Sequence, residues 1–494
     1  MAKPVVGASQ LAGPAVEPVP RQRVGGPLDT LALALVTVLA AILRLLHLND
    51  RSLSLDDGVS IALARADSST FVHWIWRSEF NMALYYLLLR VWVHVGHSEL
   101  VVRLLSVLLA TATVPAIYLV GIRLFGRSAA LMAALLLAVH PFHLALSQQV
   151  RGYPLAILLV TLSYLCFLRL LENASAGNVA LYGVLSAAAV YSHFLAGLVI
   201  PAQWFCLIWL RRPIPWKALA QAAAWVILLL LPAGIYLLHV PQSPVGWVPK
   251  ASLSQAREVL YSLTLTKERC VPYLLLWAIA LWCALRGGAP AWNYRLALSW
   301  LVTPLAVAAA AGFVQSLWVP RFLAICLPAS MLLAAAGMAQ VMRWSRLGGA
   351  AILLLLMIES ASAIRSYERH PQLSVDWRGA IQYLLPRLEP GDRLVVPPYA
   401  RFTYDYYRDL NSSPVPPVSL ASSLDEPVPA SGAENIWLLA SALYNPDDPA
   451  SGARAVQDKV EAFVAAHGPM YCAMPPQPAG ASVMVWQLRR CDGH

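Results

Sequence analysis

The chain has 494 residues, of which 59% are hydrophobic and only 13% are charged. Soluble domains carry about 25% charged residues, so this composition excludes a soluble globular protein and indicates an integral membrane protein. The formal net charge of +10 does not indicate nucleic-acid binding, because the arginines lie mostly in short breaks between apolar runs, where they act as topology signals.

The N-terminal residues 1–26 are rich in Pro, Val and Gly and include Arg21 and Arg23. We interpret them as a disordered cytoplasmic tail. The apolar run 28–48 follows with no small-residue cleavage site, so it is predicted to be a first span rather than a signal peptide.

A helix needs roughly 20 apolar residues to cross a bilayer. Segments of this kind lie at 28–48, 99–122, 128–146, 153–171, 178–192, 194–210, 217–240, 270–286, 295–313, 321–341 and 347–364, and predict about 11 transmembrane helices. The apolar stretch Asn81–Val95 is short and contains Arg90 and His94, so we interpret it as an interfacial helix together with the piece around Trp74 and Trp76. The alternative is a twelfth span, which would invert everything after it.

The positive-inside rule favours the interfacial interpretation, because the arginine-rich breaks then share one face with the N-terminal tail. The opposite, extracytoplasmic face receives the loop 49–98 with its acidic pair, the segment 148–153, His193 and Arg321. We therefore expect a membrane domain over 27–364 in the cytoplasmic (inner) membrane.

The tail 365–494 differs in composition from the membrane domain and is predicted to be a small soluble extracytoplasmic α/β domain. Turns rich in Pro and Asp separate strand-like runs at 393–396 and 483–486. Cys472 and Cys491 lie in this tail and could form a disulfide in an oxidising compartment.

The acidic pair Asp56-Asp57 follows the first span. Transfer to a hydroxyl or amine acceptor needs a carboxylate that takes or orients the acceptor proton. Adjacent side chains on a helix point about 100° apart, so we assign one acid to catalysis and the other to support. The alternative is that the pair only caps a helix over 59–66.

Three further motifs stand at outer span boundaries. Arg151, next to Tyr153, could hold a phosphate through paired donors, or could simply anchor its helix at the interface. Arg321 begins an apolar helix whose N-terminal dipole favours an anion, although snorkelling to lipid headgroups explains it equally well. A single histidine such as His193 is more often structural than an acid or base. No CxxC or HExxH spacing occurs, so no metal motif is present.

The order of these motifs resembles the membrane glycosyltransferases of the GT-C fold, in particular the bacterial family 39-like proteins, which are related to protein O-mannosyltransferases and to the aminoarabinose transferase of lipid A. The resemblance covers most of 28–385 and rests on the acidic pair Asp56-Asp57 (usually Asp-Glu), Asn81–Tyr86 (without the usual prolines), Arg103–Ser106, Gly121–Arg127, Ser147–Tyr153 (with Gln149 for the usual Glu), Tyr191–Phe194, Pro320–Phe322 and Asp376–Gly379.

The resemblance implies that the donor is a hexose or pentose on a polyprenyl phosphate and that a lipid, glycan or protein accepts the sugar with inversion. Asp56 would act as base or acceptor-orienting residue, and Asp57 would support it. The resemblance further implies that Arg321, Arg151 and, as a third candidate, Arg103 stabilise the leaving phosphate, and that Tyr153, His193, Gln149, Asn81 and Tyr85 line the cavity. Some enzymes of this fold place a divalent cation at the acidic pair, and others use no cofactor.

Two competing classes remain. A transporter or lipid flippase would carry ionisable residues near the middle of the membrane on broken helices, whereas in this chain they lie at span ends on one face. A catalytically weakened GT-C scaffold is the third class, because Gln149 cannot ionise.

Overall fold

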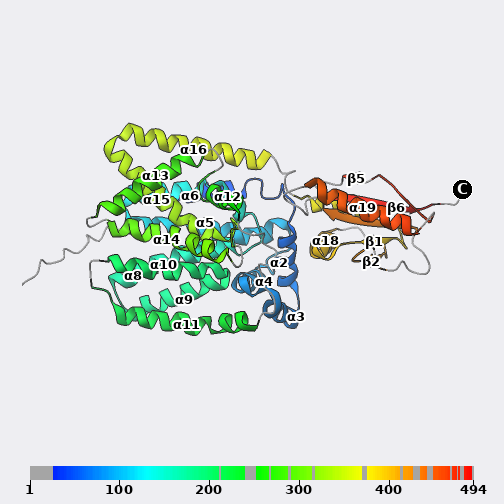
Figure 1. Ribbon diagram of the computed structural model, residues 1–494, viewed down its shortest axis with the longest axis horizontal. Helices are drawn as coiled ribbons and strands as arrows, with labels where there is room; N and C mark the ends of the chain where they lie inside the picture. The colour runs from blue at the N-terminus through cyan, green and yellow to red at the C-terminus, as the bar shows by residue number, and fades with distance from the viewer. Residues whose placement is uncertain are drawn as a thin grey trace, which may run out of the picture.

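The computed structural model describes residues 26–210, 213–239, 252–265, 269–287, 291–313, 317–369, 375–411, 416–424, 426, 434–441, 449–467, 470–475, 477–478 and 483–491. All but the last residue of the expected cytoplasmic tail lie outside this part of the chain. The described residues form a helical bundle, an adjoining layer of short helices and a C-terminal α/β domain (Figure 1).

Each of the eleven apolar segments coincides with helical structure. The helices are α1 (Pro27–Leu45), α5 (Glu99–Leu124), α6 (Arg127–Ala138) with α7 (Pro141–Ser147), α8 (Tyr153–Glu172), α9 (Ala176–Ser192), η3 (Phe194–Leu198) with α10 (Val199–Phe205) and η4 (Cys206–Trp209), α11 (Trp216–His239), α13 (Val271–Arg286), α14 (Ala291–Ala311), η5 (Leu323–Cys326) with α15 (Leu327–Trp344), and α16 (Arg346–Arg369). Within the described ranges, 7 helices are long and apolar enough to cross a membrane, and the pair α6–α7, bent by 58°, would make an eighth. The α9, η3–η4 and α13 segments are shorter, so the count of eleven spans stays a prediction.

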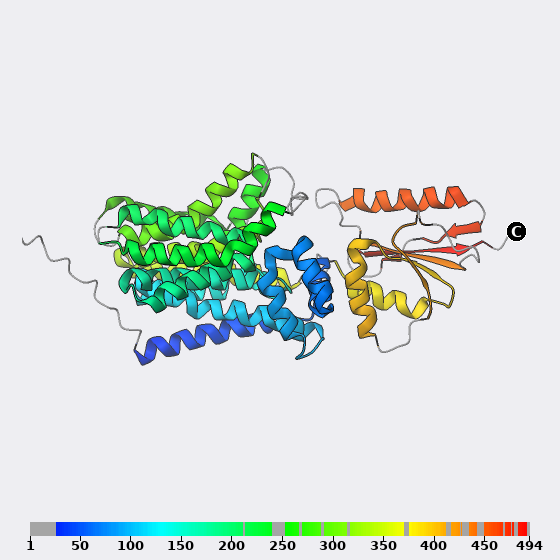
Figure 2. The same ribbon diagram turned by 90° about the horizontal axis from the view of Figure 1, so that it is seen from below.

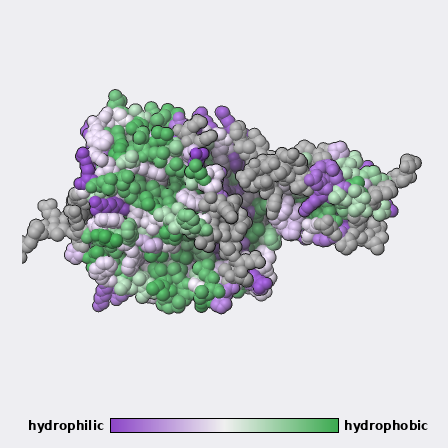
Figure 3. Space-filling model, viewed as in Figure 1, coloured by the Kyte–Doolittle hydropathy of each residue, from purple (hydrophilic) through white to green (hydrophobic). Residues whose placement is uncertain are grey.

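The face of the bundle that Figure 3 shows carries many apolar side chains, with polar ones scattered among them. Leu35 of α1, Ile227 of α11 and Leu354 of α16 expose 62%, 66% and 61% of their surface. Apolar patches of this extent are unfavourable in water, so the natural surroundings of the bundle are lipid.

The predicted outer loop is a layer of short helices between the bundle and the C-terminal domain (Figures 1 and 2). It contains α2 (Leu55–Arg65), α3 (Ser68–Trp74), the π-helix η1 (Ile75–Glu79), η2 (Phe80–Met82) and α4 (Ala83–Trp92). With 10 residues, α4 is about 15 Å long and too short to cross a membrane, which argues against the twelfth span. A further helix that the sequence did not indicate, α12 (Leu253–Leu263), lies between α11 and α13.

The C-terminal part confirms the expected small α/β architecture. It contains α17 (Trp377–Leu384), η7 (Leu385–Arg387), β1 (Arg393–Val395), η8 (Pro398–Ala400), α18 (Arg401–Leu410), β2 (Ser419–Ala421), β3 (Asn435–Ser441), α19 (Pro449–His467), β4 (Tyr471–Ala473), β5 (Gln477–Pro478) and β6 (Val483–Arg490). The sheet order is β2-β1-β3-β6-β4, with β5 also paired to β6. Strand β1 is parallel to β2 and β3, and β6 is antiparallel to β3 and β4. Cys472 and Cys491 form the disulfide that the sequence allowed.

Helix α19 covers one face of this sheet, and α17 and α18 cover the other (Figure 2). Side chains alternate accordingly, because successive strand residues point to opposite faces. Val395 and Leu438 belong to a core that includes Phe463 of α19, whereas Leu394 and Trp437 belong to the core that extends into the helical bundle. The C-terminal domain therefore shares a continuous apolar core with the membrane part.

Candidate active site

The acidic pair lies in the first turn of α2, where its two carboxylates have different surroundings. Ser54 is the N-cap: its Oγ accepts the N–H of Asp57 (3.2 Å), and Asp57 Oδ2 accepts the N–H of Ser54 (2.9 Å). The other oxygen of Asp57 accepts the N–H of Val150 (2.7 Å), and the residue is only 2% exposed. Asp57 therefore has the helix-capping role that was the alternative for the pair. Its bond to Val150 also links α2 to the turn that contains Arg151.

Asp56 points elsewhere and stays accessible, with 43% of its side chain exposed. Its Oδ2 lies 3.3 Å from Nη1 of Arg321, which precedes η5 and is 34% exposed. The structure thus joins the first outer loop to a residue far along the chain. The result is an accessible carboxylate beside a guanidinium.

Arg151 supplies a second cation. Its Nη1 donates to the Tyr86 hydroxyl (3.0 Å), and that hydroxyl donates to Glu79 Oε2 (2.7 Å). The Nε of Arg151 is buried and has no hydrogen-bond partner in the part of the chain that the structure describes. Burial alone would lower the pKa of Arg151, but Tyr86, Tyr153, Asp56 and Glu79 raise it well above the usual value, so the guanidinium stays charged.

Tyr86 and Glu79 were not among the residues singled out from the sequence. Tyr86 closes the Asn81–Tyr86 motif, so the motif itself could have identified it. Glu79 ends the π-helix η1, an element that frequently occurs at functional sites but leaves no pattern in the sequence.

His193 lies in the turn between α9 and η3, 3% exposed, with its ring against Tyr153 (5.6 Å between centroids) and Phe322 (5.2 Å). Its Nδ1 accepts the N–H of Leu195 (3.3 Å), which places the imidazole proton on Nε2. Burial, together with Arg151 and Arg321, lowers the pKa of His193 to about 3. The ring is therefore neutral at ordinary pH and forms a wall of the site.

Two other candidates, Asn81 and Tyr85, stabilise the walls of the site through hydrogen bonds. Asn81 Oδ1 accepts the N–H of Phe194 (2.8 Å) and fixes the turn after His193. The hydroxyl of Tyr85, which is fully buried, shares a hydrogen bond of 2.9 Å with Ser106 Oγ.

The turn 148–152 packs directly on the turn of His193. A Cβ on Gly152 would lie 2.9 Å from the carbonyl oxygen of Ser192 and 3.1 Å from Cβ of Tyr85. Only a residue without a side chain allows this approach, so Gly152 sets the distance between the two turns. Gln149 is half-buried in the same turn.

Arg103, the third phosphate candidate, is directed elsewhere. It is 2% exposed, and its Nη1 and Nη2 donate to the carbonyl oxygens of Leu48 (2.7 Å) and Arg51 (3.0 Å). It also pairs with Glu99 at 3.4 Å. These contacts make Arg103 a support for the chain before Asp56.

The acidic pair does not fit a divalent cation. Both oxygens of Asp57 accept backbone N–H groups, and Asp56 faces the guanidinium of Arg321. Across the described ranges, no group of three His, Cys, Asp or Glu side chains could hold a metal ion. Asp57 is therefore committed to backbone partners, and Asp56, although accessible, is the one carboxylate of the pair left for a cation.

A comparison with protein families matches the middle of the chain. The family model of dolichyl-phosphate-mannose-protein mannosyltransferases matches residues 82–236, the segment that contains Tyr86, Arg103, Arg151 and His193. A comparison with curated protein sequences gave no match.

The architecture is similar to two solved membrane proteins. ArnT from Cupriavidus metallidurans bound to undecaprenyl phosphate superimposes with a TM-score of 0.60 at 13% identity, covering 93% of this chain and 98% of that one. The Archaeoglobus fulgidus oligosaccharyltransferase tethered to an acceptor peptide with the NVT sequon gives 0.52 at 10% identity, covering 94% and 74%.

The fold is that of these two membrane proteins, the GT-C fold, and the family model matches less than half of the chain. The chain has this fold, and its resemblance to the family 39-like enzymes is confirmed.

Proposed function

We propose that this protein transfers a sugar from a polyprenyl-phosphate donor to an acceptor on the outer face of the cytoplasmic membrane, with inversion at the anomeric carbon. The observation that carries this proposal is the accessible carboxylate of Asp56 beside Arg321, with the charged, partly unpaired Arg151 in the same cluster. One acid and two guanidiniums suit a transfer from a lipid phosphate, because the acid can take the acceptor proton and the guanidiniums can bind the phosphate.

The donor phosphate would bind between Arg151 and Arg321, since charge-assisted guanidinium–phosphate bonds are strong. Because Arg321 pairs with Asp56 in the free protein, phosphate binding would draw Arg321 away and leave Asp56 free to take or orient the acceptor proton. The acceptor oxygen or nitrogen would then attack the anomeric carbon while the bond from that carbon to the phosphate oxygen breaks. The lipid phosphate leaves with the bonding electrons, and its added charge stays beside the two arginines.

Two observations support the outer location of the site. Arginine-rich span ends gather at the end of the bundle away from the C-terminal domain, where Arg127 pairs with Asp29 and Arg123 with Glu172. This is the distribution of a cytoplasmic face. The disulfide of the C-terminal domain, which lies at the other end, is typical of an oxidising compartment. The lipid-phosphate donor, rather than the location, is supported by ArnT, which has the same fold and was solved with undecaprenyl phosphate bound.

Sugar transfer in reconstituted vesicles tests the proposal. Radiolabelled polyprenyl-phosphate sugars are supplied to the wild type, to Asp56→Asn and to Asp50→Asn. Asp50 is a control acid in the same loop that is 52% exposed and pairs locally with His47. We expect Asp56→Asn to lower the rate by about 100-fold or more, the usual contribution of a general base, and Asp50→Asn to leave it unchanged. The anomeric configuration of the product, read by NMR, tests inversion.

Full activity of Asp56→Asn would reduce Asp56 to a surface acid and refute its role. A wild type that releases no sugar from any donor but moves the lipid between leaflets would be a flippase. A wild type that binds donor and does neither would be a catalytically weakened scaffold.

A further inference from the structure

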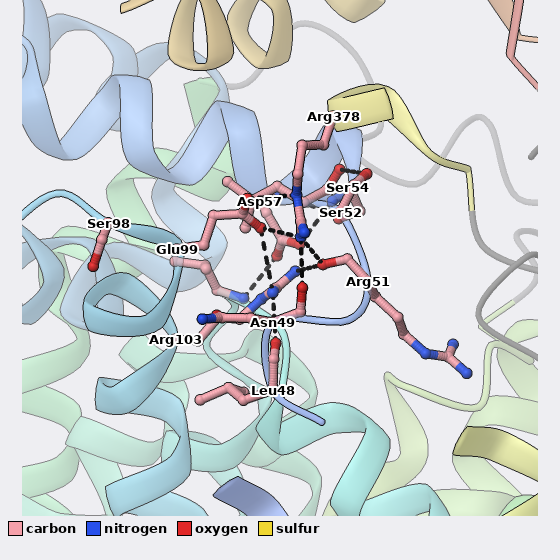
Figure 4. A network of polar contacts seen from close by, with 12 residues as sticks. Leu48, Asn49, Arg51, Ser52, Ser54, Asp57, Ser98, Glu99, Arg103 and Arg378 are labelled. Atoms are coloured by element: carbon pink, nitrogen blue, oxygen red, sulfur yellow. Dashed lines mark hydrogen bonds and ion pairs between the residues drawn. The ribbon is translucent and has the colours of Figure 1, made fainter. Parts of the chain in front are cut away.

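The chain immediately before Asp56 is hydrogen-bonded by the C-terminal domain (Figure 4). Arg378, in the first turn of α17, makes several of these contacts. Its Nη2 lies 2.8 Å from the carbonyl oxygen of Asn49 and 2.7 Å from that of Arg51. The same guanidinium pairs with Glu99 of α5, with Nε 2.8 Å from Oε1 and Nη2 2.9 Å from Oε2.

Backbone and hydroxyl groups of the C-terminal domain hold the next three residues. Ser52 Oγ accepts the N–H of Trp377 at 3.0 Å. The N–H of Leu53 donates to the hydroxyl of Tyr407 at 2.7 Å, and Thr403 Oγ1 lies 3.4 Å from the carbonyl oxygen of Ser54. The segment 49–54 thus contacts the C-terminal domain along nearly its whole length.

Helix α2 itself is pressed against the same domain. A Cβ on Gly58 would lie 2.3 Å from Thr403 Oγ1 and 2.9 Å from its backbone nitrogen. No side chain fits between α2 and the start of α18. The helix that carries Asp56 therefore has a fixed distance from the C-terminal domain.

On its other side the segment is held by the membrane part. Arg103 donates to the carbonyl oxygens of Leu48 and Arg51, and it shares the carboxylate of Glu99 with Arg378. The side chain of Glu99 is 12% exposed and that of Arg378 is 27% exposed, so water competes weakly for this contact. One arginine from each domain thus meets the same acid and the same carbonyl oxygen of Arg51.

We propose that Arg378 is a positioning residue and that the C-terminal domain sets the place of Asp56 against the donor site. This inference rests on the proposed transferase function. The domain is therefore part of the active-site scaffold. Because the arginines assigned to the donor phosphate lie outside the segment 49–54, loss of Arg378 moves the acid and spares donor binding.

The test compares Arg378→Gln with Arg387→Gln in the full-length reconstituted protein. Arg387 is an exposed arginine of the same domain, and its Nη1 donates to the carbonyl oxygen of Tyr383 (2.6 Å) within that domain. We expect Arg378→Gln to lower the single-turnover rate at saturating donor by about 10- to 100-fold, the effect of a misplacement near 1 Å, with unchanged donor KM. Arg378→Lys restores the charge but not the planar fork, so it should recover part of the rate. Arg387→Gln should behave as wild type.

A second pair of variants keeps the test valid if Arg378→Gln does not fold. Tyr407→Phe removes only the hydroxyl that accepts Leu53 N–H, and Tyr404→Phe, in the same helix, is its control. We expect a slower single turnover for Tyr407→Phe alone. Wild-type rates in folded Arg378→Gln and Tyr407→Phe, or a change confined to donor KM, overturn the inference while the transferase proposal stands. A wild type without transferase activity overturns both.

Discussion

Replacing Arg321 by glutamine separates the stability of the fold from the chemistry of the site. Arg321 and Asp56 are 3.3 Å apart but 34% and 43% exposed, and ion pairs with this much solvent access contribute only about 0.2–1 kcal/mol to stability. Glutamine retains most of the volume and a hydrogen-bond donor but loses the charge. We therefore expect the unfolding free energy of Arg321→Gln to fall by no more than about 1 kcal/mol.

The effect on catalysis should be much larger. Removing one preorganised donor to a developing oxyanion costs about 2.7–4 kcal/mol, which corresponds to about 100- to 1000-fold in rate. The assay is single-turnover sugar release in vesicles, run beside thermal unfolding in detergent. Arg269→Gln is the matched control, because Arg269 is also 34% exposed and pairs with an acid, Glu359, at 2.6 Å.

Arg269→Gln should lose a similarly small amount of stability and keep the wild-type rate. If Arg321→Gln turned over as fast as the wild type, Arg321 would be only an interfacial anchor. If both variants slowed equally, the cause would be a general loss of positive charge at the outer surface, and a specific phosphate contact by Arg321 would be refuted.

Two further predictions concern the contact between the turns of Arg151 and His193. Gly152→Ala should destabilise the protein by about 1–3 kcal/mol and slow transfer, because the new Cβ meets backbone and Cβ atoms that cannot move aside. Gly177→Ala is the control, since nothing lies within 4 Å of its Cβ, and it should be neutral or slightly stabilising. Equal behaviour of the two variants in thermal melts would contradict this prediction. The folded pKa of His193 is about 3, below the unfolded value of about 6.5, so the unfolded chain binds more protons and stability should fall as pH drops from about 6.5 towards 3. The side chain of His193→Asn can still accept the Leu195 N–H, so this variant should reduce the acid sensitivity. The measurement is the difference between the melting temperatures at pH 7 and pH 4. An unchanged difference would show that His193 is not the source of the acid sensitivity.

The membrane architecture could be predicted because span length and apolar composition depend on local sequence. The acidic pair could also be identified from the sequence, and helix geometry predicted that its two side chains point in different directions. Which acid is free could not be predicted, because Val150, whose N–H occupies Asp57, lies 93 residues further along the chain. The structural role of Arg103 could not be predicted for the same kind of reason, since its acceptors are backbone carbonyl groups without any sequence signature.

The helix count was harder to predict. The α9 and η3–η4 segments are individually short, and the structure breaks the second into three pieces. Glu79 was missed because a π-helix arises from the packing of its surroundings rather than from a residue pattern.

The hydrogen bond between Arg378 and Asn49 joins residues that are 329 positions apart. During synthesis, the segment that precedes Asp56 leaves the ribosome long before its partners in α17 and α18 exist. The active arrangement can therefore form only after nearly the whole chain has been inserted and the last domain has folded. If the proposed roles hold, a nascent or C-terminally truncated protein would have the arginines proposed to bind the donor in the membrane but its acid still unaligned, and completion of the chain would itself switch the activity on.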